Sequence, residues 1–578
     1  MYQPIYKNAR SLGRVYINQF GGVNRTEGIE ENEFVTMENM SSERFPLLCP
    51  CRARKQKVKL SELASGSEVS INAMIAPKLE PGTGLNSFTG VANVDDTPKF
   101  YYKGVEKAGV IDTTYNTYVS RKLVDFNGTI LVFPDKRYYS YVDGTSGSIT
   151  DSVTGVIKFT CTVDADDSDI FTNTMTYSGF GSSFKKGDSL SIASPISANN
   201  THNVTSKYEQ PGEDEILSCI VSKVDGNVLT VELYNRAGVK MRFTNYSQNG
   251  NSTVSRAMPD IEMACVANNR VFGVDSKGEM IFASKLGDFK NWNVFEGLST
   301  DSWYGSVGTE GPFTGIVTLG SNVVLFKHNY LHQIFGDNPQ NFSIPKQLDI
   351  GCIDGDSIVV AHGQIYFLSY DGIYVFSGGS PVKISAKLNR SYTSGYGGTD
   401  GARYYLMGRK SANISGYETV VYDIARGLWH IENSAVGTTS GYLRYNDKLY
   451  MGIPTGVNDA GLYEVHGGDV GVYNYGYQYW SVLSKWYDDS TTQKRGVNNI
   501  YIRFRMRPMS TAKVEVRTDE REWQTVGNLS WKRITSTVVR VPVRYVSGTA
   551  YQFKITGTGD VTIEAIERVV YTGGRDER

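Results

Sequence analysis

Two histidines stand at a spacing that can bind a metal ion. His328 and His332 have the i, i+4 spacing of a helical zinc site, but the residue after the first histidine is Asn329 instead of glutamate. The apolar residues on either side, from Val323 to Phe335, predict a strand, a turn and a second strand. Positions i and i+4 of a strand lie about 13 Å apart, so we expect no metal site at this pair.

A run of aspartates at 164–169 is similar to the start of a calcium-binding loop. Asp169 stands where such a loop needs glycine, and Met175 stands where it needs a bidentate glutamate. The run therefore predicts a solvated acidic loop and no bound cation.

Three further aspartates could act as the paired carboxylates of a glycoside hydrolase. They are Asp354, Asp356 and Asp371, and the sequence does not say whether they lie within reach of each other. A receptor- or glycan-binding propeller, with or without hydrolase activity, therefore remains the alternative function. The chain has no Walker loop, no GxSxG elbow and no dinucleotide-binding glycine motif, which favours a protein that is not an enzyme and uses no cofactor.

The most suggestive charged feature is a basic strip formed by Arg503, Arg505 and Arg507. Side chains alternate along a strand, so the three cations share one face about 6 to 7 Å apart. Such a strip could lie against a phosphate backbone without reading base sequence. A solvated outer sheet face, or an edge of ion pairs between subunits, is the interpretation that we favour.

Clean alternation places that strip on an antiparallel sheet. Ile500, Ile502, Phe504 and Met506 occupy the face opposite the arginines, and the stretch 551–555 repeats the pattern. We predict a C-terminal β-sandwich over residues 488–578.

A repeated two-strand unit organises the middle of the chain. Its copies begin near Asn269, Asn322 and Gly363, about 40 to 55 residues apart, which is the spacing of propeller blades. Asp371-Gly372 is a hairpin turn signal inside the last copy. We predict a β-propeller body of five to seven blades, with a first part at 61–143 and a second part at 258–487.

Two segments interrupt or precede this body. Residues 144–257 are rich in Ser, Thr, Asn and Asp, and we predict an inserted small β-barrel domain there. Residues 1–60 show few alternating strands and are predicted to be an N-terminal strap that docks on the body or on a neighbouring subunit. Its candidate assembly residues are Phe20, Gly21, Gly22, Met37, Asn39 and Phe45.

Composition agrees with an all-β fold. The 38 tyrosines and 60 glycines, against 17 prolines, suit short strands joined by tight turns. The formal net charge of −1 gives no overall attraction to nucleic acid or anionic membrane. The six cysteines are predicted to be free thiols, and we expect neither a signal peptide nor a membrane-spanning segment.

Three stretches together resemble structural proteins of tailed phages. Residues 17–48, INQFGGVNRTEGIEENEFVTMENMSSERFPLL, are similar to the opening of many such proteins. Residues 301–336 resemble the central segment of the tail nozzle proteins of short-tailed phages, also called packaged-DNA stabilisation proteins. The predicted sandwich, which contains IEAIERVVYTGGR near its end, has the place and length expected for that family, whereas 144–257 is not covered.

This resemblance implies a role in the virion. Family members are propeller subunits that form closed, sixfold rings below the portal and its adaptor proteins. The ring continues the DNA channel, helps to retain and deliver the genome through non-specific contacts with DNA, and carries fibre, spike or needle proteins. The expected location is the virion tail, with assembly in the host cytoplasm.

Overall fold

The computed structural model covers 578 residues. The structure describes residues 10–64, 67–80, 85–116, 119–166, 170–193, 204–205, 217–234, 240–243, 246–247, 252–275, 277–293, 300–411, 416–432, 439–453, 460–470, 472–473, 476–477, 479–488, 495–519, 521–530, 535–542 and 547–572.

The chain forms two compact units of nearly pure β-structure. One unit contains residues 1–71, 82–88 and 356–578, and the other contains 72–81 and 89–355. The described residues hold only one short α-helix, α1 (Phe180–Ser183), and three single-turn 3-10 helices. The predicted all-β class is confirmed.

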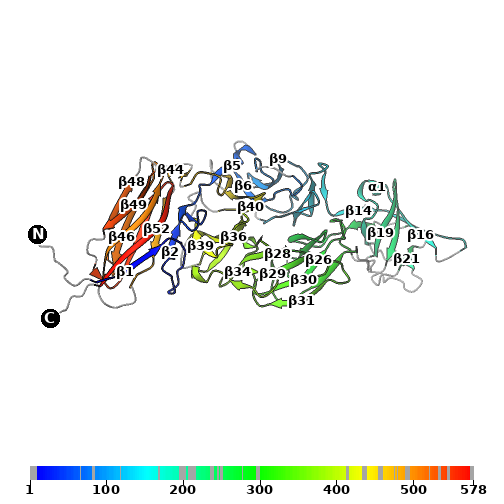
Figure 1. Ribbon diagram of the computed structural model, residues 1–578. Helices are drawn as coiled ribbons and strands as arrows, with labels where there is room; N and C mark the ends of the chain where they lie inside the picture. The colour runs from blue at the N-terminus through cyan, green and yellow to red at the C-terminus, as the bar shows by residue number, and fades with distance from the viewer. Residues whose placement is uncertain are drawn as a thin grey trace. The chain divides into compact units, whose positions relative to one another are not determined.

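Four-stranded sheets recur along the chain (Figure 1). In each, strands that are consecutive in sequence lie side by side, which is the order of a propeller blade. They comprise β6 (Val69–Met74), β7 (Gly90–Val94), β8 (Thr97–Tyr102) and β9 (Val105–Glu106); β10 (Lys122–Phe126), β11 (Thr129–Phe133), β12 (Arg137–Ser140) and β13 (Ser146–Ser148); β24 (Met263–Ala267), β25 (Arg270–Val274), β26 (Met280–Ala283) and β27 (Trp303–Ser306); β28 (Phe313–Leu319), β29 (Asn322–Lys327), β30 (Leu331–Phe335) and β31 (Ser343–Leu348); β32 (Val359–Ala361), β33 (Gln364–Ser369), β34 (Gly372–Phe376) and β35 (Val382–Lys383).

Neighbouring sheets of the second unit are joined by shared apolar cores. Phe126 of β10 and Val271 of β25 belong to one cluster, and Phe272 of β25 and Leu325 of β29 belong to the next. A short sheet buries its apolar faces only by stacking on other sheets, so these clusters hold the repeated units together.

The N-terminal segment supplies strands to sheets formed late in the sequence. The sixth four-stranded sheet combines β40 (Gly441–Tyr445), β41 (Lys448–Ile453) and β42 (Gly461–Glu464) with β5 (Lys55–Lys59). Leu462 of β42 pairs with Val58 of β5. Residues 1–60 show few alternating strands in sequence, yet they supply β2 and β5 to sheets formed by late strands. The partners of β2 and β5 lie hundreds of residues away, so no local pattern announces these pairings.

A nine-stranded sheet continues a blade-like set of four strands into the C-terminal region. Its strands, in spatial order, are β36 (Tyr392–Thr399), β37 (Arg403–Lys410), β38 (Tyr417–Asp423), β39 (Leu428–Ile431), β2 (Phe34–Glu38), β45 (Tyr479–Ser484), β51 (Tyr551–Thr558), β47 (Thr511–Thr518) and β48 (Gln524–Ser530).

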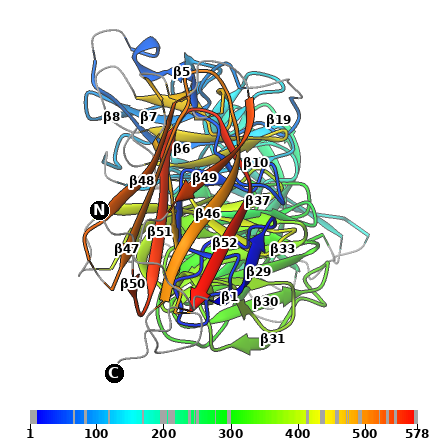
Figure 2. The same cartoon turned by 60° about the vertical axis from the view of Figure 1, so that its left-hand side comes forward.

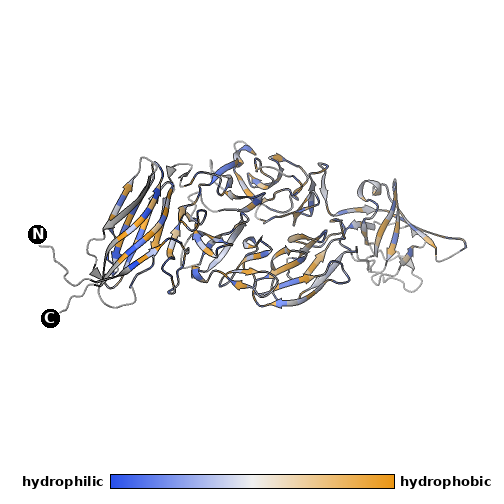
Figure 3. Ribbon diagram, viewed as in Figure 1, coloured by the Kyte–Doolittle hydropathy of each residue, from blue (hydrophilic) through white to orange (hydrophobic). Residues whose placement is uncertain are grey.

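A five-stranded sheet holds the rest of the C-terminal region (Figure 2). It contains β1 (Arg10–Ile17), β52 (Val561–Thr572), β46 (Arg495–Met506), β49 (Thr535–Pro542) and β50 (Ser547–Gly548). Ile500, Ile502, Phe504 and Met506 are fully buried, as their alternation predicted. Figure 3 shows the hydrophilic and hydrophobic bands that alternate along these strands.

The strands of the predicted insertion form a sheet of their own. Its path runs through β14 (Asp151–Gly155), β23 (Ser252–Arg256), β17 (Ser189–Ala193), β19 (Leu217–Asp225), β20 (Val228–Tyr234), β16 (Phe171–Thr176), β15 (Lys158–Val163) and β22 (Tyr246–Ser247), with β21 (Lys240–Phe243) and β18 (Val204–Thr205) attached. A buried core that includes Phe159, Met175 and Leu229 supports it.

The structure also bears on the predictions about the cysteines and about membrane-spanning segments. All six cysteines are free thiols, as expected. Among the described residues, no helix combines the length and apolar character that crossing a bilayer requires.

Candidate functional site

The predicted strap residues lie where β2 joins two sets of strands. Glu38 of β2 pairs with Ile431 of β39 on one side, and Met37 pairs with Val482 of β45 on the other. The strap therefore docks on the body of its own chain and completes the nine-stranded sheet. We call residues 20–48 the clasp.

Gly22 brings the clasp against the backbone of β39. Its φ is +87°, and a Cβ built on it would lie 2.8 Å from the carbonyl oxygen of Trp429. The next residue, Val23, donates its backbone N–H to that same oxygen at 2.7 Å. Only glycine combines this left-handed backbone with such a close approach. At Gly21, a Cβ would lie 2.8 Å from Cγ of Glu33.

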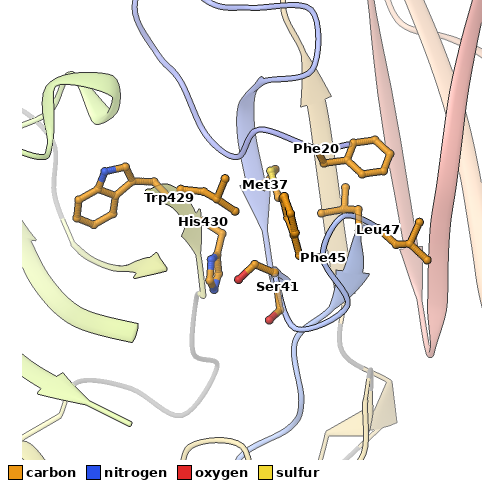
Figure 4. Close-up of a pocket in the computed structure, with 10 residues that line it drawn as sticks. Phe20, Met37, Ser41, Phe45, Leu47, Trp429 and His430 are labelled. Carbon is orange, nitrogen blue, oxygen red and sulfur yellow. The ribbon is translucent and has the colours of Figure 1, made fainter. Parts of the chain in front are cut away.

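A small cavity lies between part of the clasp and β39 (Figure 4). It measures about 10 Å³, which is roughly the room that one water molecule needs. Met37 and Phe45 lie on the clasp side, His430 faces them from β39, and the Trp429 ring points away. The Arg426 guanidinium lies 4.9 Å from the centre of the Phe45 ring. The other residues that line the cavity are Phe20, Ser41, Ser42, Leu47, Leu48 and Leu428.

Asn39 fixes the end of β2 on both sides. Its backbone N–H donates to the carbonyl of Ile431 at 2.7 Å, and its side-chain amide donates to the carbonyl of Tyr479 at 2.8 Å. Its φ of +55° is a conformation that asparagine tolerates better than most residues.

Ion pairs tie the clasp to the blade-like strands. Arg25 donates to both carboxylate oxygens of Glu418, at 2.9 and 3.3 Å, and Arg390 donates to Glu418 at 2.9 Å. Burial acts to raise the pKa of Glu418, but the hydrogen bond and charge of Arg25 outweigh it and lower that pKa below its usual value. Glu33 is held similarly by Lys387 at 2.7 Å.

A second set of ion pairs ties the clasp to the C-terminal strands. The fully buried Arg568 of β52 pairs with Glu31, and its guanidinium lies 3.6 Å from the centre of the Tyr487 ring. Arg44 donates to Asp560 at 2.9 Å. The clasp is thus bonded to the strands on both of its sides.

The basic strip lies on an exposed sheet face and has acidic neighbours. Arg503 is exposed on β46, and Arg507 follows the end of that strand. Arg505 pairs with Glu564 at 2.5 Å, and Arg507 pairs with Asp560 at 2.9 Å. These carboxylates reduce the positive charge that the strip presents.

The histidine pair occupies the predicted strand and turn. His328 is exposed in the turn after β29, whereas His332 is buried in β30 and its Nε2 lies 2.9 Å from the Thr309 hydroxyl. Burial and the positive charge of Lys327 lower the pKa of His332 to about 4. No cluster of three metal-ligating side chains occurs in the part of the chain that the structure describes.

The three candidate carboxylates belong to two different units. Asp354 belongs to the second unit, whereas Asp356 and Asp371 belong to the first. The Asp371 carboxylate accepts hydrogen bonds from Lys383 at 3.0 Å and from Tyr374 at 3.1 Å. The acidic run at 164–169 lies partly outside the described residues.

Sequence reasoning missed a buried cluster of titratable side chains. Oε1 of Glu432 lies 3.1 Å from Nε2 of His430 and 3.4 Å from Nε2 of His466. Nδ1 of His466 lies 3.3 Å from a nitrogen of Arg403. His430 and Glu432 are two residues apart at the end of β39, but Arg403 belongs to β37 and His466 follows β42. No spacing in the sequence brings these three stretches together.

Comparisons with known proteins give no family. No family model matches the chain, and no curated protein matches it. Solved structures with some likeness include an exo-β-1,3-galactanase from Phanerochaete chrysosporium, with 12% identity and a TM-score of 0.21 over 54% of this chain and 95% of that one. The N-terminal domain of Nup159 has 12% identity and a TM-score of 0.25, over 44% of this chain and 72% of that one. The extracellular domain of a putative hybrid two-component system from B. thetaiotaomicron has 11% identity and a TM-score of 0.26, over 90% and 71%. Likenesses this low carry no inference about function.

Proposed function

We propose that this protein is a structural subunit of a phage tail, a ring-forming nozzle that lies below the portal and adaptor. It continues the DNA channel, helps to retain and deliver the genome, and offers a platform for fibres or a needle. The proposal starts from the resemblance of residues 17–48 and 301–336 to that family.

The observation that best supports a mechanical role is the clasp. Domains of one chain usually move relative to each other, because their interfaces are small and polar. Here β2 replaces such an interface with main-chain hydrogen bonds to β39 and to β45. A subunit that must resist the pressure of packaged DNA benefits from strands that cannot separate without breaking a continuous sheet.

We also infer the finer architecture. The six four-stranded sheets and the four strands β36 to β39 would be the blades of one closed propeller, with β5 as the N-terminal strand that completes the last blade. The ten-stranded sheet would be a barrel-like insertion, and the two C-terminal sheets would form a sandwich. This assignment follows the strand order and the predicted domain limits at 61–143, 144–257, 258–487 and 488–578.

Mass photometry of the purified full-length chain tests the proposal. We expect a closed oligomer, sixfold by the family resemblance, either alone or after addition of a candidate adaptor protein from the same virion. A chain that stays monomeric under both conditions and never enters a virion would contradict the proposal. Release of reducing sugar from a polysaccharide, abolished by Asp371→Asn, would favour the glycan-hydrolysing alternative instead.

A further inference from the structure

A buried arginine of the N-terminal segment has no counter-charge among the described residues. Arg54 is 8% exposed, and its Nη1 has no hydrogen-bond partner. No hydrogen bond or ion pair of this guanidinium is found in the described part of the chain. A buried charge without a partner is costly, so something must compensate it.

Tyr442 lies within electrostatic range of both Arg54 and Glu432. Burial raises the pKa of Tyr442 to about 12, and the neighbouring Arg54 charge opposes that rise. The Tyr442 ring centre lies 6.3 Å from that of Tyr405, whose ring centre lies 5.9 Å from that of His466.

Arg403 supplies a second guanidinium N–H group that has no hydrogen-bond partner. One of its terminal nitrogens reaches Asp400 at 3.4 Å and His466 at 3.3 Å, while its Nε has no partner. The hydroxyl of Tyr405 also donates to Asp400, at 2.9 Å. Asp400 is thus already engaged by Arg403 and Tyr405.

The other carboxylates nearby are also occupied. Glu432 accepts from His430 and His466, and Glu43 accepts from Arg52 at 2.8 Å. Burial opposes ionisation of Glu432, but the adjacent His466 and His430 hold its pKa well below the usual value. Among the described residues, Nη1 of Arg54 and Nε of Arg403 thus remain as buried guanidinium donors without a hydrogen-bond partner.

We propose that a small inorganic anion occupies this cluster, bound by Nη1 of Arg54 and Nε of Arg403. Guanidinium groups bind anions through charge-assisted hydrogen bonds, and these are stronger where water is excluded. Arg54 belongs to the N-terminal segment and Arg403 belongs to β37. The anion would therefore fasten the N-terminal segment to the sheets. This inference does not depend on the proposed role in a tail.

Thermal unfolding of the full-length protein at constant ionic strength tests this site. Sodium gluconate is replaced stepwise by chloride, sulfate or phosphate, which separates a monovalent anion from tetrahedral ones. We expect at least one of these anions to raise Tm by about 2 °C or more, with a response that saturates. Arg54→Met should abolish the saturable part. In gluconate it should be no less stable than the parent, because it removes an uncompensated buried charge.

The matched control is Arg409→Met, which removes an exposed arginine from the same strand as Arg403. Its response to anions should equal that of the parent. General salting effects act on all variants alike, so an equal response in parent and Arg54→Met would overturn the proposal, as would no response in the parent. If Arg54→Met does not fold, Arg54→Lys keeps the charge but loses the planar fork. An unchanged apparent affinity in that variant would likewise overturn the proposal.

Discussion

At the scale of single residues, Gly22 is the position where the sequence leaves least freedom. Its left-handed backbone and the nearby carbonyl of Trp429 exclude any side chain. The Phe-Gly-Gly motif suggested a close backbone approach, but the sequence could not name the partner. That partner lies some four hundred residues further along the chain.

We predict that Gly22→Ala destabilises the protein by about 2 to 4 kcal/mol, because it combines a strained φ with a backbone clash. Urea unfolding followed by tryptophan fluorescence measures the change. Gly28→Ala is the matched control, since its Cβ would meet nothing nearer than 3.9 Å and should cost less than about 0.5 kcal/mol. Equal effects of the two substitutions would show that the clasp does not approach β39 as described.

The buried Glu418 predicts how stability depends on pH. Its pKa is lower in the folded state than the ordinary value of 4.5, so the unfolded chain binds its proton more readily. The stabilisation is complete above about pH 4.5 and is lost as the pH falls through the folded pKa. We expect Glu418→Gln to lower the free energy of unfolding by about 2 kcal/mol at pH 7. The stability of this variant should also fall less steeply than that of the parent as the pH is lowered. Unfolding titrations at pH 7, 5 and 4 measure both effects. If the variant loses stability with falling pH as steeply as the parent, Glu418 is not the source of this pH dependence.

The basic strip is expected to contribute little to DNA binding. Glu564 and Asp560 already pair with Arg505 and Arg507, which leaves Arg503 as the member with the least compensation. Changing all three arginines to glutamine should leave the affinity for duplex DNA within about twofold and the salt dependence unchanged. Fluorescence anisotropy over a salt series measures this, with Arg409→Gln as the control. A salt slope reduced by about one to three would restore the strip as a DNA contact.

At the scale of elements, local pairings could be predicted and distant ones could not. The hairpin signal Asp371-Gly372 lies at the turn between β33 and β34, and the strand residues Ile365, Phe367 and Phe376 are fully buried. Turn chemistry and alternation act over a few residues, so they are visible in the sequence. The pairings of β2 and β5 are set by tertiary packing alone, which no local pattern records.

The importance of β2 gives a prediction at this scale. Phe34 begins the strand, is fully buried, and its ring centre lies 5.9 Å from that of Phe20. Phe34→Ala should cost about 3 to 5 kcal/mol, because it opens a cavity between two sets of strands. Thr36→Ala, at a half-buried position of the same strand, should cost less than about 1 kcal/mol. Limited proteolysis should cut Phe34→Ala first within the clasp, and a variant as resistant as the parent would contradict the bridging role of β2.

For the candidate site too, the sequence could reveal some residues but not their distant partners. The six clasp residues were selected from sequence motifs, and the structure gathers them around β2 and β39. The ion pairs of Arg25, Glu31 and Arg44 join residues hundreds of positions apart. They depend on which strands become neighbours, so composition and spacing carry no trace of them.

For the whole molecule, the proposed role in a tail depends on self-assembly. The chain is nearly all β, and its N-terminal segment is built into sheets that contain the last strands of the chain. Such a subunit would suit the ring that we propose. The resemblance to tail nozzle proteins supplies the shape and symmetry that we expect for that ring.

Electron microscopy of the purified full-length protein, with and without the candidate adaptor protein, tests directly whether the subunits form a ring. Class averages should show a ring with rotational symmetry and a central opening wide enough for duplex DNA. Isolated single subunits in both samples, with no ring at any concentration, would contradict it.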